Sequence, residues 1–278
     1  MRKVKPLNDF IFKKVFGEKG NEDILISFIN AVLKRTKKEP IVEIEIIDNK
    51  QLNKALILDK TGIIDVRAKT SKGENIDIEV QLTDQGNMDK RTLFYWGKMY
   101  LENIKQGQDY TSLEKVITIN ILDFNFLGTE SYQSSFHLWE DIEKDYMLTD
   151  VVEIHFLELP KFRNKKDKDY RKNDIERWLM FLEKDIPETT LKELMSLDTA
   201  IEKAEQKIEY LSSDEESMRI YYERERSLHE RANMISSAEE RKAIEIAKNL
   251  LDVLDDEIIA AKTGLDIEEV KSLRVKNP

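Results

Sequence analysis

Residues 63–81 read Ile-Ile-Asp-Val-Arg-Ala-Lys-Thr-Ser-Lys-Gly-Glu-Asn-Ile-Asp-Ile-Glu-Val-Gln, and the expected fold is organised around this stretch. Apolar and polar residues alternate from Ile76 to Gln81, which is the period-2 pattern of a half-buried strand. A three-residue hairpin loop usually ends in a left-handed residue, a conformation that glycine adopts easily. The stretch therefore predicts two short strands joined by a turn at Ser71-Lys72-Gly73.

The position of the glycine also predicts how the two strands pair. If Gly73 is the left-handed residue of the turn, Thr70 pairs with Glu74, and the same count places Asp65 opposite Glu79. Directly opposite residues share one face of a sheet, with their Cβ atoms about 5 Å apart. We therefore expect two carboxylates to lie side by side on the hairpin.

Two adjacent carboxylates repel each other unless a cation or a proton lies between them. One interpretation is a divalent metal held by oxygen ligands, with magnesium as the first candidate. The same register places Arg67 opposite Asp77, and Gln81 one step beyond Glu79 on the same face. The alternative is a solvated strand face on which Arg67 neutralises one of the carboxylates. The spacing alone leaves both interpretations open.

The composition excludes several classes of protein. The 278 residues are 40% hydrophobic and 36% charged, and they contain no cysteine and three scattered histidines. Disulfides, thiolate catalysis and cysteine metal sites are therefore excluded, and a zinc cluster is not expected. The N-terminus has no apolar signal region, and no apolar run approaches the roughly 18 residues of a transmembrane helix. These features predict a cytoplasmic protein without a membrane partner.

The net charge of −10 comes almost entirely from the chain beyond residue 182. The preceding region is close to neutral and can present a local basic face to nucleic acid, because local fields matter more than totals. Two basic runs are candidates for this face, Lys34–Lys38 and Lys161–Lys172. The first is either a solvated helix end or a phosphate site. The second is either a solvated loop or an arm that binds a nucleic-acid backbone.

The periodicity of the remaining chain predicts an α/β domain followed by a helical region. Helical spacing is expected at 6–16, from Asn21 to the basic run, and at 87–106; strands are expected at 41–47, 116–126, 131–138 and 150–159. Later helices are expected around Trp178 and at 191–210, 215–232 and 238–253. A change in composition near Pro187 divides the chain into residues 1–186 and 187–278.

Two helices near the hairpin carry side chains of interest. In the first helix the polar part is expected to hold Asn8, Asp9, Lys13 and Lys14, and Asn21 is expected to cap the next helix. In the helix at 87–106 the core stripe is expected to be Leu93, Trp96, Tyr100 and Ile104, with Arg91, Tyr95 and Lys98 on another side. Arg91 is expected either to pair with Asp77 or Glu79, or to contact a phosphate.

The segment at 255–273 has the length of a helix-turn-helix, with its turn at Thr263-Gly264-Leu265. Its second helix begins with acidic residues, which would repel phosphates. DNA reading by this segment is therefore less favoured than packing or binding of a partner.

An Asp on one strand and Glu-x-Gln on the next resemble the PD-(D/E)xK nuclease core. A longer ordered set of motifs resembles the Rpn family of recombination-promoting nucleases and transposases over nearly the whole chain. The motifs are Asn8-Asp9-x-x-Phe12-Lys13-Lys14-x-Phe16-Gly17, Asp65, Ile78-Glu79-Val80-Gln81, Lys90-Arg91-Thr92-Leu93-Phe94-Tyr95-Trp96, Gly107-Gln108-Asp109-Tyr110, Leu157-Glu158-Leu159-Pro160-Lys161-Phe162, Ile244-Glu245-Ile246-Ala247-Lys248-Asn249-Leu250-Leu251 and Thr263-Gly264-Leu265.

The resemblance implies a restriction-endonuclease-like core, a mixed central sheet flanked by helices, and a metal-dependent DNA endonuclease linked to recombination or mobile elements. It implies that Asp65 and Glu79 bind Mg²⁺, with Mn²⁺ or another divalent cation as alternatives. Gln81 stands where the wider superfamily usually has Lys. Glutamine can orient a water molecule but supplies no positive charge.

The resemblance also implies a set of accessory or DNA-binding side chains: Asp9, Lys13, Lys14, Asp77, Arg91 and Tyr95. A homodimer is expected, because cutting both antiparallel strands needs two sites. One alternative is a non-catalytic DNA-binding or assembly protein with a degenerate nuclease fold and an acidic helical tail that drives oligomerisation. A third is a nuclease that acts on RNA or on branched junctions.

Overall fold

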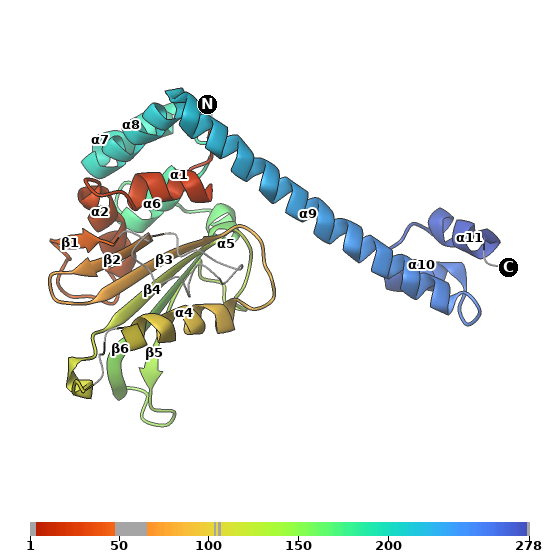
Figure 1. Cartoon of the computed structure of the whole chain (residues 1–278), viewed down its shortest axis with the longest axis horizontal. Coiled ribbons are helices and arrows are strands. Elements are labelled where there is room, and N and C mark those ends of the chain that lie inside the picture. Colours follow the sequence, from red (N-terminus) through yellow and green to blue (C-terminus); the bar gives the residue numbers. More distant parts are fainter. Residues whose placement is uncertain (1–3, 48–65, 103, 105–106, 277–278) are drawn as a thin grey trace. The chain divides into compact units, whose positions relative to one another are not determined.

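The computed structural model describes residues 4–47, 66–102, 104 and 107–276 (Figure 1). Asp65 lies outside the described residues. The chain forms two compact units, Met1–Tyr221 and Tyr222–Pro278, which divide within one helix. None of the helices in these ranges is long and apolar enough to cross a membrane.

The first unit is built on a six-stranded mixed sheet with the strand order β1-β2-β3-β4-β6-β5. The pairs β1–β2, β2–β3 and β5–β6 are antiparallel, whereas β3–β4 and β4–β6 are parallel. The strands are β1 (Ile44–Ile46), β2 (Val66–Thr70), β3 (Asn75–Gln81), β4 (Val116–Leu122), β5 (Gln133–Trp139) and β6 (Met147–Glu158). This confirms the predicted mixed central sheet.

The hairpin of β2 and β3 has the predicted turn and register. Gly73 has φ of +90°, its N–H donates to the carbonyl of Thr70 at 2.9 Å, and the N–H of Thr70 donates to the carbonyl of Glu74 at 2.9 Å. Arg67 lies opposite Asp77, as the turn predicted. The pairing of Asp65 with Glu79 stays a prediction, because the described part of β2 begins at Val66.

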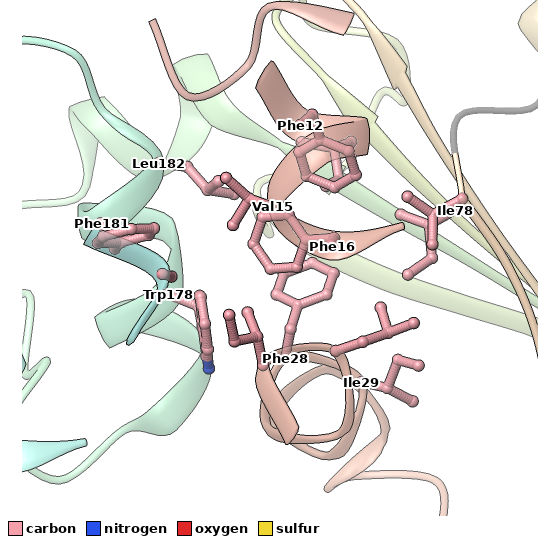
Figure 2. Close-up of a cluster of buried hydrophobic side chains, with 14 of the residues drawn as sticks. Phe12, Val15, Phe16, Phe28, Ile29, Ile78, Trp178, Phe181 and Leu182 are labelled. Carbon is pink, nitrogen blue, oxygen red and sulfur yellow. The ribbon is translucent and has the colours of Figure 1, made fainter. Parts of the chain in front are cut away.

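One face of the sheet is apolar and is covered by three helices, α1 (Asp9–Phe16), α2 (Glu22–Leu33) and α6 (Asp174–Leu182). Ile76 and Ile78 of β3 belong to the core beneath them. The helices present aromatic rings at helical spacing, and Figure 2 shows these rings gathered between α1, α2 and α6. Phe16 stands between Phe12 and Trp178, with ring centroids 4.5 and 5.6 Å away. This packing anchors α1 and α6 to the sheet.

Two asparagines near α1 act differently from the prediction. Asn8 was expected on the polar side, but it is buried and accepts hydrogen bonds from the N–H groups of Phe10 and Ile11. It is the N-cap of α1, where a side-chain oxygen satisfies otherwise unpaired donors. Asn21 precedes α2 but makes no side-chain cap bond there. Its amide instead donates to the carbonyls at the end of α1.

The opposite face of the sheet is covered by α4 (Met88–Glu102), which packs against β4. The predicted core stripe of α4 is wrong at Leu93, which is 52% exposed, and Tyr95, assigned to another side, is buried. Trp96 of the predicted stripe is half-buried and packs against the core. The buried stripe is Met88, Thr92, Tyr95 and Met99. The sheet beneath α4 carries Thr118 and Asn120, and α4 faces them with the hydroxyl of Thr92 rather than with its most apolar side.

The first unit is completed by four short elements: the 3₁₀ turn Tyr110–Ser112, α5 (Leu159–Asn164), α7 (Glu188–Leu197) and α8 (Thr199–Ser213). Helix α8 packs against α1 and α2, where Asp198 accepts a hydrogen bond from Ser27. The predicted boundary between residues 186 and 187 lies within this unit.

Helix α9 (Glu215–Leu250) is continuous, so the prediction of two helices at 215–232 and 238–253 is wrong. The residues between them include neither Pro nor Gly, and a started helix extends at little cost without such breakers. Beyond it, α10 (Asp256–Thr263) ends at Gly264 with φ of +76°, and α11 (Ile267–Lys276) follows. A small core holds these helices together: Ala247, Leu251, Ile259 and Val270.

Candidate functional site

The candidate site lies on the sheet face beneath α4. Successive strand residues point to opposite faces, so Asp77 and Glu79 share one face while Ile76 and Ile78 enter the apolar core on the other. Both carboxylates are almost fully buried, with 1% of Asp77 and 2% of Glu79 exposed. Two acids buried on one strand face are costly unless each has a partner.

Glu79 pairs with Arg91 of α4. The Nε of Arg91 donates to its Oε2 at 3.3 Å. The other oxygen, Oε1, is buried and has no hydrogen-bond partner among the described residues. Burial raises the pKa of Glu79, and the charge and hydrogen bond of Arg91 oppose that shift. A buried carboxylate oxygen without a donor is suited to a divalent cation, because Mg²⁺ takes oxygen ligands.

Arg67 of β2 lies opposite Asp77 of β3, and its side chain forms an ion pair with α4. Its Nη1 donates to Oε2 of Glu102, the last residue of α4, at 2.7 Å. Arg67 is therefore more than a neutralising neighbour of the carboxylates. It ties the end of α4 to β2, the strand that pairs with the site-bearing β3.

The middle of α4 is held to the sheet by uncharged side chains. The hydroxyls of Thr92 and Thr118 lie 3.2 Å apart, and Nδ2 of Asn120 donates to Thr92 at 3.0 Å and to the carbonyl of His155 at 3.0 Å. Buried polar groups that are fully hydrogen-bonded specify one arrangement. This network sets the position of Arg91, one residue before Thr92.

Gln81 is the last residue of β3 and is only partly buried. It follows Glu79 by two residues, so its side chain lies on the same face of the strand. Its carbonyl accepts the N–H of Asp123 at 2.9 Å, which holds the end of the strand in place. The side-chain amide of Gln81 is therefore expected beside Glu79, at the more open end of this face.

Tyr95 and Arg91 contact each other on α4. The guanidinium carbon of Arg91 lies 5.3 Å from the centre of the Tyr95 ring, a cation–π distance. Tyr95 is buried, so it supports the Arg91 side chain from one side while Glu79 holds it from the other. The resemblance named both residues as accessory; in the structure Arg91 contacts Glu79, and Tyr95 contacts Arg91.

The end of α1 approaches the start of β2. A Cβ on Gly17 would lie 3.1 Å from Cγ2 of Val66 and 2.9 Å from the carbonyl of Lys13, so only glycine allows this approach. Lys13 is half-buried beside this contact, whereas Lys14 pairs with Glu18 at 2.6 Å. Asp9 is exposed in the first turn of α1. Of these residues, Lys13 is the one that the Gly17 contact places beside the hairpin.

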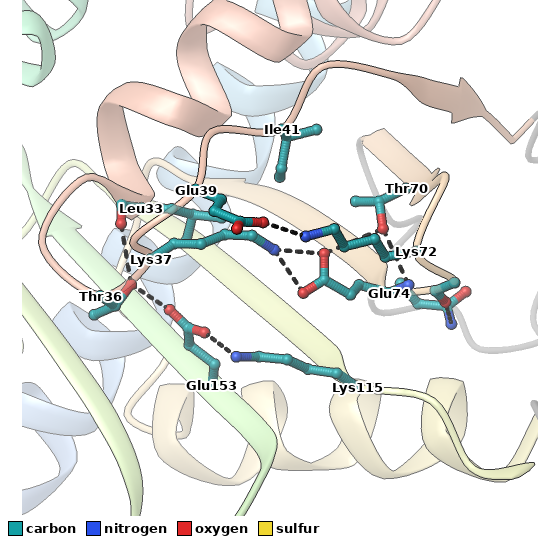
Figure 3. Close-up of polar contacts among 12 residues, drawn as sticks. Leu33, Thr36, Lys37, Glu39, Ile41, Thr70, Lys72, Glu74, Lys115 and Glu153 are labelled. Atoms are coloured by element: carbon teal, nitrogen blue, oxygen red, sulfur yellow. Dashed lines mark hydrogen bonds and ion pairs between the residues drawn. The ribbon is translucent and has the colours of Figure 1, made fainter.

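The basic runs take part largely in intramolecular ion pairs. Figure 3 shows Lys37 against Glu74, at 2.5 Å, and Lys115 against Glu153, at 2.6 Å. Lys34 pairs with Asp174 at 2.6 Å. In the second run the paired residues are Lys161 with Glu158, Arg163 with Asp123 and Glu183, Lys165 with Glu176, Arg171 with Glu193, and Lys172 with Asp169. These cations stabilise the fold.

Of the two predicted metal ligands, Asp65 and Glu79, only Glu79 lies within the described residues. Among residues 4–47, 66–102, 104 and 107–276, no group of three acidic or histidine side chains is arranged to hold a metal ion. Glu79 is one predicted ligand, and the other, Asp65, lies outside that set. The donor chemistry of Glu79 fits a divalent cation, and its Oε1 is the atom that such a cation would satisfy.

The polar network of β4, formed by Thr118 and Asn120, was not predicted from the sequence. The strand expected at 116–126 reads as an apolar run, yet Thr118 and Asn120 alternate with isoleucines within it. This alternation was the available signal, because it marks one polar face on a buried strand. Arg67 contacts Glu102 across 35 residues of sequence, and no local pattern indicates that contact.

Comparison with known proteins gives one family. The sequence profile described as PD-(D/E)XK nuclease family transposase matches residues 6–238, which include the hairpin, α4 and the whole sheet. No curated protein and no solved structure matches the chain significantly.

Proposed function

Since the chain belongs to the PD-(D/E)XK nuclease family transposases, we propose that it is a metal-dependent endonuclease that hydrolyses phosphodiester bonds in DNA during recombination or the movement of mobile elements. The family confirms the resemblance drawn from the motifs, and the mixed sheet with flanking helices is consistent with a restriction-endonuclease-like fold. The observation that carries the proposal is the buried carboxylate of Glu79, which has one oxygen without a hydrogen-bond partner in the described structure.

We assign the metal to Asp65 and Glu79, with Mg²⁺ as the first candidate and Mn²⁺ as the next. A bound divalent cation lowers the pKa of a coordinated water and neutralises charge on the phosphate. Glu79 supports this role because its burial raises its pKa, so its ionised form is stabilised by any cation placed at Oε1.

Gln81 orients the attacking water by hydrogen bonding, since an amide both donates and accepts. It carries no charge, so another side chain supplies positive charge to the phosphate. Arg91 is suited to this role because its guanidinium is already at the carboxylate, 3.3 Å from Glu79, and is supported by Tyr95. Guanidinium binds phosphate with two parallel hydrogen bonds.

The proposed partner is double-stranded DNA, and the proposed assembly is a homodimer, because cleavage of both antiparallel strands needs two sites. Lys13 is half-buried near the start of β2 and can contact the DNA backbone. Asp77 lies two residues before Glu79 and contributes negative charge to the same face.

The test is nicking of supercoiled plasmid DNA by wild type, Asp65→Ala and Glu79→Ala with Mg²⁺, Mn²⁺ or Ca²⁺. Wild type is expected to cut with Mg²⁺ or Mn²⁺, and both variants are expected to lose cleavage. Glu74→Gln is the control, because Glu74 belongs to the same hairpin but pairs with Lys37. Cleavage by the Glu79 and Asp65 variants at the wild-type rate would exclude the assigned site.

A second candidate function is DNA binding or assembly without catalysis. The observation that favours it is the uncharged Gln81 together with the ion pair that already neutralises Glu79. In that case wild type would retard DNA in a gel and leave it intact with every metal. RNA and branched junctions are tested as substrates in the same assay.

A further inference from the structure

Helix α4 has an apolar outer side as well as an inner side that faces the site. Leu93 is 52% exposed and Phe94 is 55% exposed, and no segment within the described ranges covers them. Large apolar residues exposed together usually mark a contact surface. We call Leu93 and Phe94 the α4 wedge.

The wedge is connected to the candidate site through ring and charge contacts. The rings of Phe94 and Tyr95 meet edge to face, with centroids 5.6 Å apart. Tyr95 supports Arg91 at 5.3 Å, and Arg91 contacts Glu79 at 3.3 Å. The exposed ring is therefore three contacts away from the carboxylate assigned to the metal.

The charged residues one turn on either side of Phe94 are basic. Lys90 precedes Phe94 by one helical turn and Lys98 follows it by one turn, with Nζ of Lys98 5.9 Å from the ring centre. Both lysines lie on the same helix side as Phe94, because residues four apart are neighbours. Of the two acidic residues of α4, Glu102 is engaged by Arg67, and Asp89 is exposed one turn before Leu93, on the Leu93 side of the wedge.

This arrangement distinguishes between possible occupants. A second copy that packed wedge to wedge would bring the same two lysines together, which is unfavourable. A nucleic acid presents phosphates to the lysines and flat bases to the ring. Single-strand-binding proteins combine these two elements, aromatic stacking and basic side chains.

We propose that the α4 wedge contacts a nucleobase next to the scissile phosphate, with Phe94 stacked on or inserted beside the base and Lys90 and Lys98 on the flanking phosphates. The inference rests on the proposed function and adds a substrate preference. Inserting a side chain between bases requires unstacking, which costs least at a mismatch or an unpaired base. The protein therefore prefers DNA that is already distorted at the cleavage position.

The test uses the full chain with Ca²⁺ and duplex DNA that carries 2-aminopurine at successive positions. Wild type is expected to raise 2-aminopurine fluorescence at one position, where the base leaves its stack. Phe94→Ala is expected to lose that signal and to bind intact duplex about 10-fold more weakly, as expected for loss of one base–aromatic contact. On a duplex with a mismatch at that position the difference is expected to shrink.

Tyr210→Ala is the matched control. Tyr210 is an exposed helical aromatic residue, 62% exposed, with Nζ of Lys207 5.9 Å from its ring centre, but it lies on α8. This variant is expected to keep both the affinity and the fluorescence change of wild type.

Equal affinity and equal fluorescence for wild type and Phe94→Ala would overturn the wedge. If both also cut DNA equally, the proposed nuclease function would stand without it. If wild type neither binds nor cuts any DNA, both proposals fail. A change in oligomeric state by light scattering in Phe94→Ala, with DNA affinity unchanged, would assign the surface to a second copy and overturn the inference.

Discussion

Two glutamates on opposite faces of the same sheet, Glu79 and Glu153, show how a structural acid differs from a candidate functional one. Each is about 2% exposed. Glu153 lies 2.5 Å from the hydroxyl of Thr36, 2.6 Å from Nζ of Lys115 and 2.7 Å from Nε2 of His155 (Figure 3 shows the first two). Glu79 has Arg91 at 3.3 Å and one oxygen without a hydrogen-bond partner in the described structure.

The pKa values of these two acids shift in opposite directions. Burial raises the pKa of both carboxyls, but hydrogen bonds from His155, Lys115 and Thr36 outweigh burial at Glu153 and lower its pKa far below the usual range. At Glu79 burial outweighs Arg91, and the pKa is raised. Surplus donors thus indicate a carboxylate that stabilises the fold, and a deficit of donors indicates one suited to a further ligand.

The largest expected effect is on cleavage. Glu79→Gln is expected to reduce metal-dependent nicking at least about 100-fold, because a metal ligand supplies several kcal/mol of transition-state stabilisation and each 1.36 kcal/mol is tenfold in rate. Glu153→Gln is expected to nick at the wild-type rate under conditions where it is folded. Initial rates on supercoiled plasmid measure both. The comparison breaks if Glu153→Gln loses activity while folded and Glu79→Gln does not.

The free energy of unfolding is also expected to differ between the two variants. Here the larger loss is expected in Glu153→Gln. Glu153→Gln is expected to lower the free energy of unfolding by about 3 kcal/mol at neutral pH, because it leaves Lys115 beside an uncharged group. Glu79→Gln is expected to lower this free energy by less in the absence of metal, because it leaves Arg91 beside an uncharged group but also removes a carboxylate that burial disfavours. Urea denaturation in a chelating buffer measures both values. A loss of equal size in both variants would remove the distinction.

The contributions of Glu153 and Glu79 to stability are also expected to change with pH in opposite directions. The folded pKa of Glu153 is depressed, so its contribution is present above its unfolded pKa of about 4.5 and is lost as pH falls below that value. The folded pKa of Glu79 is raised, so its contribution is full below about pH 4.5 and is lost as pH rises through the folded pKa. The measurement is the free energy of unfolding of wild type minus that of each variant, obtained by denaturation at pH values from 3.5 to 8. If both contributions rose, or both fell, with increasing pH, the contrast between Glu79 and Glu153 would be wrong.

Metal is expected to stabilise the fold through the site of Asp65 and Glu79, and not through Glu153. At a free concentration ten times its Kd, a divalent cation that binds only the folded state adds about 1.4 kcal/mol. Wild type and Glu153→Gln are therefore expected to melt a few degrees higher with Mg²⁺ or Mn²⁺, whereas Glu79→Gln is expected to show no shift. Thermal melts with and without chelator measure the effect. An equal shift in Glu79→Gln would place the metal elsewhere.

An effect of about the same size as that of the metal concerns the position of α4. Thr92→Val keeps the side-chain shape and removes the hydroxyl that links Thr118 and Asn120. We expect a loss of about 1 to 2 kcal/mol in unfolding free energy, because a buried amide loses an acceptor. Nicking is expected to fall less than in Glu79→Gln. Thr70→Val is a control in the same sheet, since Thr70 bonds to Glu74 at the turn.

Sequence patterns predicted the parts of the fold that depend on neighbours in the chain. Gly73 predicted the turn and the pairing of Arg67 with Asp77, and the alternation in β3 placed Asp77 and Glu79 on one face. The same reasoning placed Leu93 on the wrong side of α4. The spacing of large apolar residues pointed to Leu93, whereas the polar sheet beneath selected Thr92 and Tyr95.

The sequence by itself determined the family, the hairpin register and the shared face of the carboxylates, because turn chemistry and strand alternation act between residues close in the chain. Only the tertiary structure decided which of the two buried glutamates has hydrogen-bond donors for its carboxylate and which lacks one. Thr36 and Lys115 reach Glu153 from two loops far away in the sequence, and His155 lies two residues along the same strand, while Glu79 meets only Arg91 among the contacts described. Donors that converge through space leave no periodic pattern in sequence, so only the fold shows where one is missing.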